Sequence, residues 1–240
     1  MTHDPLTPKT RKAALTDHLR AGILTLEYHP GSDLDEVALC DRFGLSRTPV
    51  REVFRDLDGM GYLELRENKG ARVAALSHTT LRDFFLVAPM IYSAILRMAA
   101  RNATSVQIGK LKQAQEAFTA ALRQGSGAER ALSNNAFHEI TGEMAHNVYL
   151  VPSFHRLLID HARIGMTFYQ PRNRQMADNL AEASAQHDAI IAAIEVGDEE
   201  AAAALAEAHW ALSRNEIERF VLPVPLDLEL GEDQVGGGAS

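Results

Sequence analysis

The sequence predicts a mainly α-helical protein in which an N-terminal winged helix-turn-helix precedes an all-α helical bundle. Three observations predict this architecture: a basic helix after a tight turn, two short alternating segments after that helix, and long apolar stripes at helical spacing in the remaining chain. We expect a first domain at residues 1–77 and a second, helical domain at 78–222. The acidic, glycine-containing tail at 223–240 is predicted to be disordered.

The first two predicted helices are defined by apolar spacing and by turn residues. Residues 9–27 form an amphipathic pattern, which the turn-forming sequence His29-Pro30-Gly31-Ser32 ends. A short second helix is expected over residues 35–43, and Gly44 supplies a tight turn after it. Two helices joined by a short turn that contains glycine predict a helix-turn-helix.

The helix after this turn is strongly basic. Residues 42–55 contain four arginines and one glutamate, although the whole chain has a net charge of −8. Ser46 is predicted to cap this helix, and Pro49 falls in its first turn. The apolar face is formed at helical spacing by Val50, Val53, Phe54 and Leu57. The adjacent arc carries Arg47, Thr48, Arg51 and Arg55.

The segment after the basic helix predicts a β-hairpin. A glycine pair at 59 and 61 ends the helix, residues 62–66 and 71–74 alternate as strands do, and Asn68-Lys69-Gly70 forms the turn. With Lys69 and Arg72 at its tip, this hairpin is a wing suited to phosphates or to the minor groove. A basic helix alone is more often a solvated surface, but this order of elements favours binding to double-stranded DNA.

These residues resemble the DNA-binding domain of the GntR family of bacterial transcription regulators. The resemblance covers about 60 residues and is carried by the core Ser46-Arg47-Thr48-Pro49-Val50-Arg51-Glu52 and by the later Asn68-Lys69-Gly70-Ala71. It implies that Arg47 and Arg51 contact bases, that Ser46 and Thr48 contact phosphates and base edges, and that Gly70 lies at the wing tip. Val37 stands where some members have an arginine, which leaves the operator sequence open.

Composition separates the two halves of the chain. Residues 1–77 carry 11 basic and 12 acidic side chains, and the remaining residues carry 13 and 20. The second part is therefore not expected to be a nucleic-acid surface. The lone Cys40 excludes an internal disulfide. Because neither an 18-residue apolar run nor an apolar N-terminal signal core is found, we expect a cytoplasmic protein without a membrane partner.

The second part is rich in alanine and poor in glycine, and its apolar stripes recur at helical spacing. The breaks between the stripes fall at short polar or glycine-containing segments, of which Gly197-Asp198 is the clearest. These stripes predict an all-α bundle with helices at residues 79–101, 104–124, 127–146, 150–170, 174–196 and 198–220.

Three histidines share apolar stripes on different predicted helices. His187 lies with isoleucines, His209 lies with leucines, and His138 follows Phe137 one turn after Asn134. Inward-facing imidazoles on three helices could converge on one divalent metal ion. A histidine on an apolar stripe is also often a hydrogen-bonded core residue, and the spacing alone leaves both interpretations open.

The helical part resembles the FCD ligand-sensing domain of the FadR branch of the GntR family. The resemblance spans about residues 79–222 and is carried by Asn134, Phe137, His138, Glu182, His187, Gly197, Asp198 and His209. In metal-binding members an aspartate and three histidines coordinate one divalent cation. The resemblance therefore implies a metal site formed by His138, His187 and His209, with Asn134 in the aspartate position. Imidazole ligands favour Zn or Ni as the metal.

The resemblance also implies a small-molecule effector, an organic acid in many members. The arginine that usually holds a carboxylate effector is absent from the aligned segment at residues 88–92. Either the effector is not a simple hydroxy-carboxylate, or another basic side chain holds it, and the candidates are Arg97, Arg101, Arg163 and Arg172.

The leading hypothesis is a homodimeric transcription regulator, a repressor that binds a pseudo-palindromic operator and responds to an effector. Two alternatives remain at this point. A helical metal-dependent enzyme could be fused to the DNA-binding domain, with Glu139 and Glu143 as the nearest acid or base groups. Alternatively, the metal itself could be the signal, which would make the protein a direct metal sensor.

Overall fold

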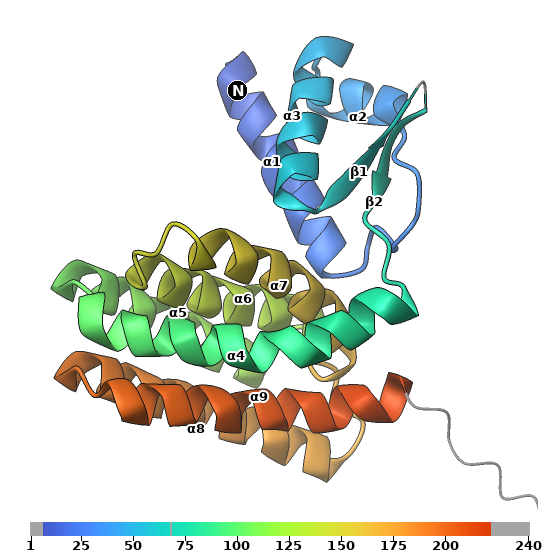
Figure 1. Cartoon of the computed structure of the whole chain (residues 1–240). Coiled ribbons are helices and arrows are strands. Elements are labelled where there is room, and N and C mark those ends of the chain that lie inside the picture. Colours follow the sequence, from blue (N-terminus) through green and yellow to red (C-terminus); the bar gives the residue numbers. More distant parts are fainter. Residues whose placement is uncertain (1–6, 68, 222–240) are drawn as a thin grey trace, which may run out of the picture.

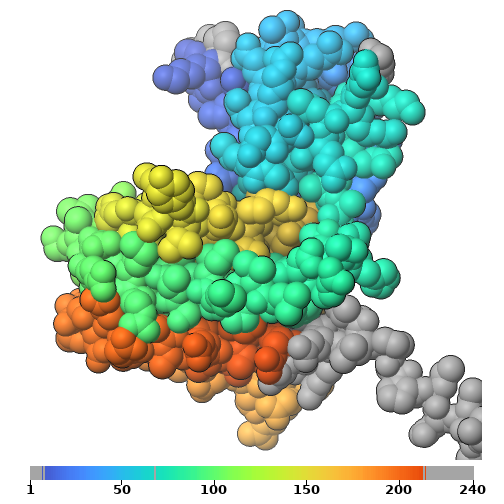
Figure 2. Space-filling model, viewed as in Figure 1, coloured from blue at the N-terminus to red at the C-terminus, as the bar shows by residue number. Residues whose placement is uncertain are grey.

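The computed structural model describes residues 7–67 and 69–221, and the predicted disordered tail at 223–240 lies outside these residues. Two helical units are stacked on each other, with the smaller N-terminal unit above a layered bundle (Figure 1). The mainly α-helical architecture predicted from the sequence is confirmed. In the space-filling view, the N-terminal unit rests on the side of the bundle that contains α7 (Figure 2).

The N-terminal unit is a three-helix fold with a two-stranded wing. Its helices and strands are α1 (Pro8–Leu24), α2 (Glu36–Phe43), α3 (Arg47–Met60), β1 (Leu63–Arg66) and β2 (Gly70–Val73). The strands pair antiparallel, with Leu63 opposite Val73. Helix α1 is shorter than predicted, because Leu26 takes a left-handed conformation (φ 62°) and the Tyr28 N–H bonds back to the Gly22 carbonyl.

Two glycines in the left-handed conformation end helices α2 and α3. Gly44 ends α2 at φ 60° and Gly61 ends α3 at φ 88°, a region that side-chain-bearing residues rarely adopt. Asp35 caps α2 by accepting two backbone N–H groups. Ser46 occupies the predicted N-cap position of α3, but its hydroxyl makes no capping hydrogen bond there.

The bundle consists of long helices that match the predicted spans closely. They are α4 (His78–Asn102), α5 (Ser105–Gln124), α6 (Gly127–Met144), α7 (Leu150–Ile164), α8 (Arg174–Val196) and α9 (Glu199–Val221). The predicted helix at 150–170 is divided, because α7 ends at Ile164 and a single 3₁₀ turn (Gly165–Thr167) follows. Gly197, at φ 73°, and Asp198 separate α8 from α9 as the sequence predicts.

The two units share packing. Ile159 and Ala162 of α7 are buried in the same apolar cluster as the core of the N-terminal unit. The guanidinium of Arg163 is buried, donates to the Ala74 carbonyl at 2.6 Å and pairs with Asp160. Arg20 of α1 also reaches across to α6. The junction therefore contains apolar contacts, a buried ion pair and a charged contact near its rim.

Helix α4 is the single helix within the described residues whose length and apolar content would suffice for a membrane span. It packs along α9, α6 and α7 in the bundle, as core helices of water-soluble proteins also do. Its length and composition are therefore weak support for a membrane segment. Leu86, Val87 and Met90 on this helix remain exposed.

Candidate nucleic-acid interface and metal centre

Helix α3 has the two faces that its sequence predicts. Val50, Val53 and Leu57 are completely buried, and Phe54 is 1% exposed. The side chains on the neighbouring arc are exposed, namely Arg47, Thr48, Arg51 and Arg55. Burial of the apolar face fixes the helix in the N-terminal unit, so the basic arc is presented to solvent at a defined angle.

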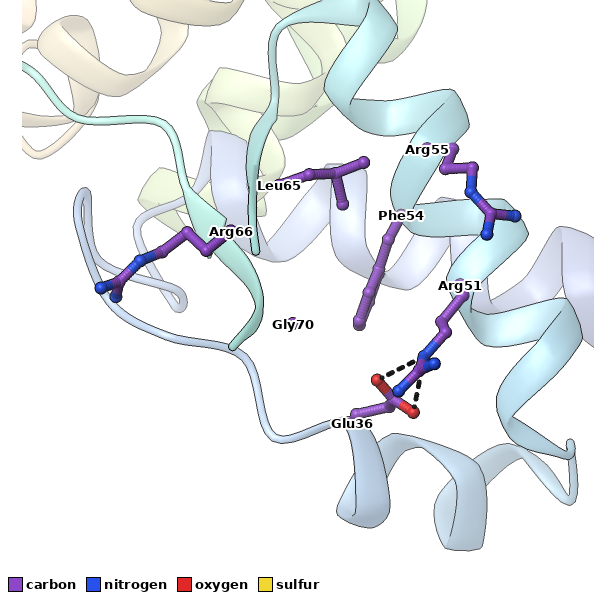
Figure 3. Close-up of a pocket in the computed structure, with 7 residues that line it drawn as sticks. All are labelled: Glu36, Arg51, Phe54, Arg55, Leu65, Arg66 and Gly70. Atoms are coloured by element: carbon purple, nitrogen blue, oxygen red, sulfur yellow. Dashed lines mark hydrogen bonds and ion pairs between the residues drawn. The ribbon is translucent and has the colours of Figure 1, made fainter. Parts of the chain in front are cut away.

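An acidic residue on α2 faces this basic arc. Both oxygens of Glu36 accept from Nε of Arg51, at 3.2 and 3.1 Å. Arg47 lies slightly farther away, with its Nε 3.7 Å from Glu36. In Figure 3, Glu36 and Arg51 face each other across the gap between α2 and α3, beside a cavity that Arg55, Leu65 and Gly70 also line. Sequence reasoning did not single out Glu36.

The two strands of the wing form as predicted, but its basic residues are not equivalent. Gly70 has φ 76°, which the turn requires, and Lys69 is exposed. Arg72 was predicted at the wing tip, whereas the structure places it within β2 opposite Glu64. Its Nε donates to Asp33 at 3.0 Å, which lowers the pKa of that carboxyl group. Arg66 donates to the same oxygen at 3.0 Å.

The three predicted histidines converge inside the bundle. His138 comes from α6, His187 from α8 and His209 from α9, and all three are buried. Their ring centroids are 4.7 to 5.3 Å apart. One potential ligand nitrogen from each ring lies within 4.8 Å of the others. Phe137 stacks on His187 with ring centroids 3.8 Å apart, which holds that imidazole in place.

Two glutamines determine which nitrogen of each ring is free. The Gln115 amide nitrogen donates to Ser184 and Asp188, so its oxygen accepts from Nδ1 of His187 at 2.9 Å. In the same way, the Gln186 nitrogen donates to Glu182 at 3.1 Å, and its oxygen faces Nδ1 of His209 at 3.1 Å. Both histidines therefore carry their proton on Nδ1, and Nε2 keeps a lone pair.

Two of the cluster's ring nitrogens lack a hydrogen-bond partner. Nε2 of His138 and Nε2 of His187 are buried without a hydrogen-bond partner. A buried imidazole nitrogen that accepts no hydrogen bond is unfavourable unless a cation or donor approaches it. Burial lowers the pKa of all three rings, to about 3 for His209 and well below its usual range for His138 and His187. The imidazoles are neutral, as metal ligands must be.

Asn134, the predicted fourth ligand, is buried near His209. It is 5% exposed, and it lines a narrow cavity together with His209 and a further histidine, His161. Nδ1 of His161 hydrogen-bonds to the Tyr92 hydroxyl at 2.7 Å, and burial lowers the pKa of His161 to about 4. Asn134, His161 and His209 thus bring an amide and two neutral imidazoles to this cavity.

The proposed effector arginines are not gathered at this cavity. Arg97 and Arg101 form ion pairs with Glu200 and Glu199 at the start of α9. His209 is about ten residues farther along that helix, which corresponds to roughly 15 Å. Arg163 is buried at the junction with the N-terminal unit, as described above. Arg172 is exposed. That any of them holds an effector stays a prediction.

Sequence reasoning missed Gln115, Gln186, Tyr92 and His161. A signal existed for Gln186, because it lies four residues after Glu182 and directly before His187. Gln115 gave no such signal, since it is 72 residues from its histidine partner. Tyr92 and His161 are likewise 69 residues apart.

A winged helix-turn-helix with a basic outer arc, joined to a helical bundle with inward imidazoles, defines a two-domain DNA-binding transcription regulator. The family model for bacterial regulatory proteins of the gntR family matches residues 11–73, and the model for the FCD domain matches residues 87–212. The chain belongs to the GntR family of bacterial transcription regulators and carries an FCD domain. This family membership confirms a regulator and not an enzyme.

Relatives agree with this assignment, and a solved structure shows the same fold. The probable D-xylose utilization operon transcriptional repressor of Paenarthrobacter nicotinovorans is 30% identical over 175 residues, which is 72% of this chain and 73% of the relative. The galactonate operon transcriptional repressor of Escherichia coli is 26% identical, over 75% of this chain and 88% of the relative. Escherichia coli McbR/YncC shares the fold, with a TM-score of 0.73 at 16% identity, over 88% of this chain and 99% of that chain.

Proposed function

We propose that the protein is a homodimeric repressor whose operator affinity is controlled by a small-molecule effector bound near a divalent metal in the helical bundle. The observation that carries the metal part of this proposal is the pair of partnerless Nε2 atoms on His138 and His187, which meet His209 in one buried cluster. Most buried polar atoms in proteins have a hydrogen-bond partner, so two unpartnered imidazole nitrogens in one cluster support a bound cation.

The metal would be held by Nε2 of His138, His187 and His209, with the Asn134 amide oxygen as a further ligand. A histidine-rich set favours Zn²⁺ or Ni²⁺ over Mg²⁺ or Ca²⁺. When bound, such an ion supplies a positive charge that can hold an anionic or hydroxylated effector. Gln115 and Gln186 orient two of the rings toward it.

DNA binding would use the arc of α3 and the wing. Arg47 and Arg51 suit guanine edges in the major groove, whereas Ser46, Thr48, Arg55 and Lys69 suit phosphates and neighbouring edges. Gly70 allows close approach of the wing backbone. In a two-fold dimer, two such units read the half-sites of a pseudo-palindrome. A regulator that binds chromosomal operators acts in the cytoplasm.

The dimer is supported by an apolar stripe on α4. Leu86 and Met90 are 66% and 73% exposed and lie one turn apart, and Val87 adjoins them. Such a stripe on the outer face of a bundle helix is typical of a surface that another molecule covers. The names of two relatives, which concern operons for D-xylose utilisation and galactonate, support a sugar or sugar acid as the first effector class to test.

The test uses the full chain, purified without a histidine tag and stripped of metal with a chelator. Zn²⁺ and Ni²⁺ are titrated, and duplexes are selected from a random pool with and without metal. We expect one metal per chain, a two-fold symmetric motif, and release of that DNA by D-xylose, D-galactonate or a related compound. Arg51→Ala should keep the fold and lose specific binding.

Each part of the proposal can fail separately. Wild-type protein that selects no motif would refute operator binding. Protein that takes up no metal would refute the metal centre, and the histidines would then be core residues. DNA affinity that follows free metal without any organic ligand would support a direct metal sensor instead.

A further inference from the structure

We propose that Glu36 is a specificity-determining positioning residue, which holds Arg51 so that the outer edge of its guanidinium faces a guanine. This inference rests on the proposed binding of an operator by α3. It concerns how one arginine on that helix discriminates between bases. It also assigns a role to an acidic residue on a surface where phosphate binding favours basic residues.

The contact between the two side chains has an unusual geometry. Nε of Arg51 donates to both oxygens of Glu36, at 3.2 and 3.1 Å, and this is the inner nitrogen of the guanidinium. Within residues 7–67 and 69–221, neither Nη nitrogen of Arg51 donates a hydrogen bond. Figure 3 shows the guanidinium between α2 and α3, with Glu36 on the α2 side. The carboxylate therefore occupies one edge of the guanidinium and leaves the other edge available.

The available edge matches one base. A guanidinium carries five N–H donors in a rigid plane, and two of them can donate together to O6 and N7 of guanine. The Glu36 side chain is only 14% exposed, whereas that of Arg51 is 56% exposed. The acid is thus fixed against the protein while the arginine projects. An arginine that is held in one rotamer loses less entropy on binding, and it cannot swing to a phosphate instead.

Glu36 lowers affinity for DNA in general, because its charge repels phosphates. It also partly neutralises Arg47, whose Nε is 3.7 Å away. A residue that weakens non-specific binding while it fixes a base-reading arginine raises the ratio of specific to non-specific affinity. This explains why a carboxylate is found beside Arg47 and Arg51 of the basic arc.

Three variants of the full chain separate positioning from charge. Glu36→Gln removes the charge, and Glu36→Asp keeps the charge but withdraws the carboxylate by one methylene group. Glu52→Gln is the matched control, because Glu52 lies on the exposed side of α3 and pairs with Lys12 at 3.2 Å. Each protein selects duplexes from the same random pool at the same salt concentration. Thermal unfolding followed by circular dichroism checks the fold.

We expect the wild-type motif to contain a guanine whose preference is lost in Arg51→Ala. Glu36→Gln and Glu36→Asp should weaken the preference at that same position, and reduce the ratio of specific to non-specific affinity by about tenfold. Glu52→Gln should raise affinity for all sequences without changing the preference. Glu36→Asp is decisive, since its charge is unchanged.

The inference is overturned if both Glu36 variants keep the guanine preference of the wild type. It is also overturned if they lose a cytosine preference and keep the guanine, because Glu36 would then contact a base itself. A wild-type protein that selects no motif would overturn the proposed operator binding, and this inference with it. The wild-type arm therefore distinguishes failure of the function from failure of the inference.

Discussion

Glu139 on α6 accepts a hydrogen bond from Arg20 on α1 at 2.6 Å, and the residue directly before it is His138 of the histidine cluster. Successive helical residues point about 100° apart, so one turn of α6 faces both the cluster and the N-terminal unit. Arg20 also donates to the Tyr62 hydroxyl at 3.2 Å, next to the wing. A shift of α6 would therefore move residues both in the histidine cluster and at the contact with the N-terminal unit.

This connection predicts that Glu139→Gln weakens the influence of the bundle on DNA binding. The pair is partly exposed, so we expect a loss of stability below about 1 kcal/mol. The ratio of operator affinities with and without bound metal or effector should move toward one. Without the ion pair, a change in the position of α6 on ligand binding is transmitted less strongly to α1. Fluorescence anisotropy with a selected duplex measures this ratio.

Glu143→Gln is the matched control, because Glu143 lies one turn farther along α6 and lines, together with Glu139 and Arg20, a cavity between the two units. It should leave the ratio unchanged. If Glu139→Gln has the wild-type ratio as well, the ion pair does not transmit the signal.

A second prediction concerns Gln115. Replacement by leucine removes the acceptor that keeps the proton of His187 on Nδ1, so the ring can present the wrong nitrogen to a metal. We expect metal affinity to fall about 10- to 100-fold, as is typical when such partners are lost. Competition with a chromophoric chelator measures the change. Gln113→Leu, on the exposed side of the same helix, should bind metal as the wild type does.

Local patterns made most of the fold predictable. The apolar stripe of α3 and the stop at Gly197 depend on residues close together in sequence, and the structure has both. The three histidines were predictable because the helical repeat sets which side of a helix each one faces. The partners across helices were not, since Gln115, Glu36 and Tyr92 meet their partners only after packing. Likewise, positive charge marked Arg97 and Arg101 as effector candidates, but their acidic partners lie across the α4–α9 contact.

A third prediction concerns pH and the metal-free protein. Burial lowers the folded-state pKa of His161 to about 4 and of His209 to about 3, whereas both titrate near 6.5 when unfolded. Below pH 6.5 the unfolded chain therefore binds more protons than the folded one, and stability falls as the pH decreases toward those values. Each such histidine should lower the free energy of unfolding by about 1 kcal/mol at pH 5.5 relative to pH 7.5. Urea unfolding at the two pH values measures it.

The variant His161→Leu tests the same prediction, because it removes one titrating group. Its absolute stability will change with the loss of the Tyr92 hydrogen bond, so only the pH dependence is compared. The difference between pH 7.5 and 5.5 should shrink by about 1 kcal/mol. A metal-free wild type whose stability is the same at both pH values would contradict the prediction.

A fourth prediction concerns the exposed stripe of α4. Met90→Lys places a charge on this stripe, where Met90 is 73% exposed in the single chain, so the fold should be retained while any partner surface is disrupted. We expect the variant to be monomeric in light scattering and to bind a two-half-site operator far more weakly than the wild type. Val196→Lys, at an equally exposed position (78%) at the end of α8, should stay dimeric. Dimeric Met90→Lys protein would show that this stripe is not the dimer contact.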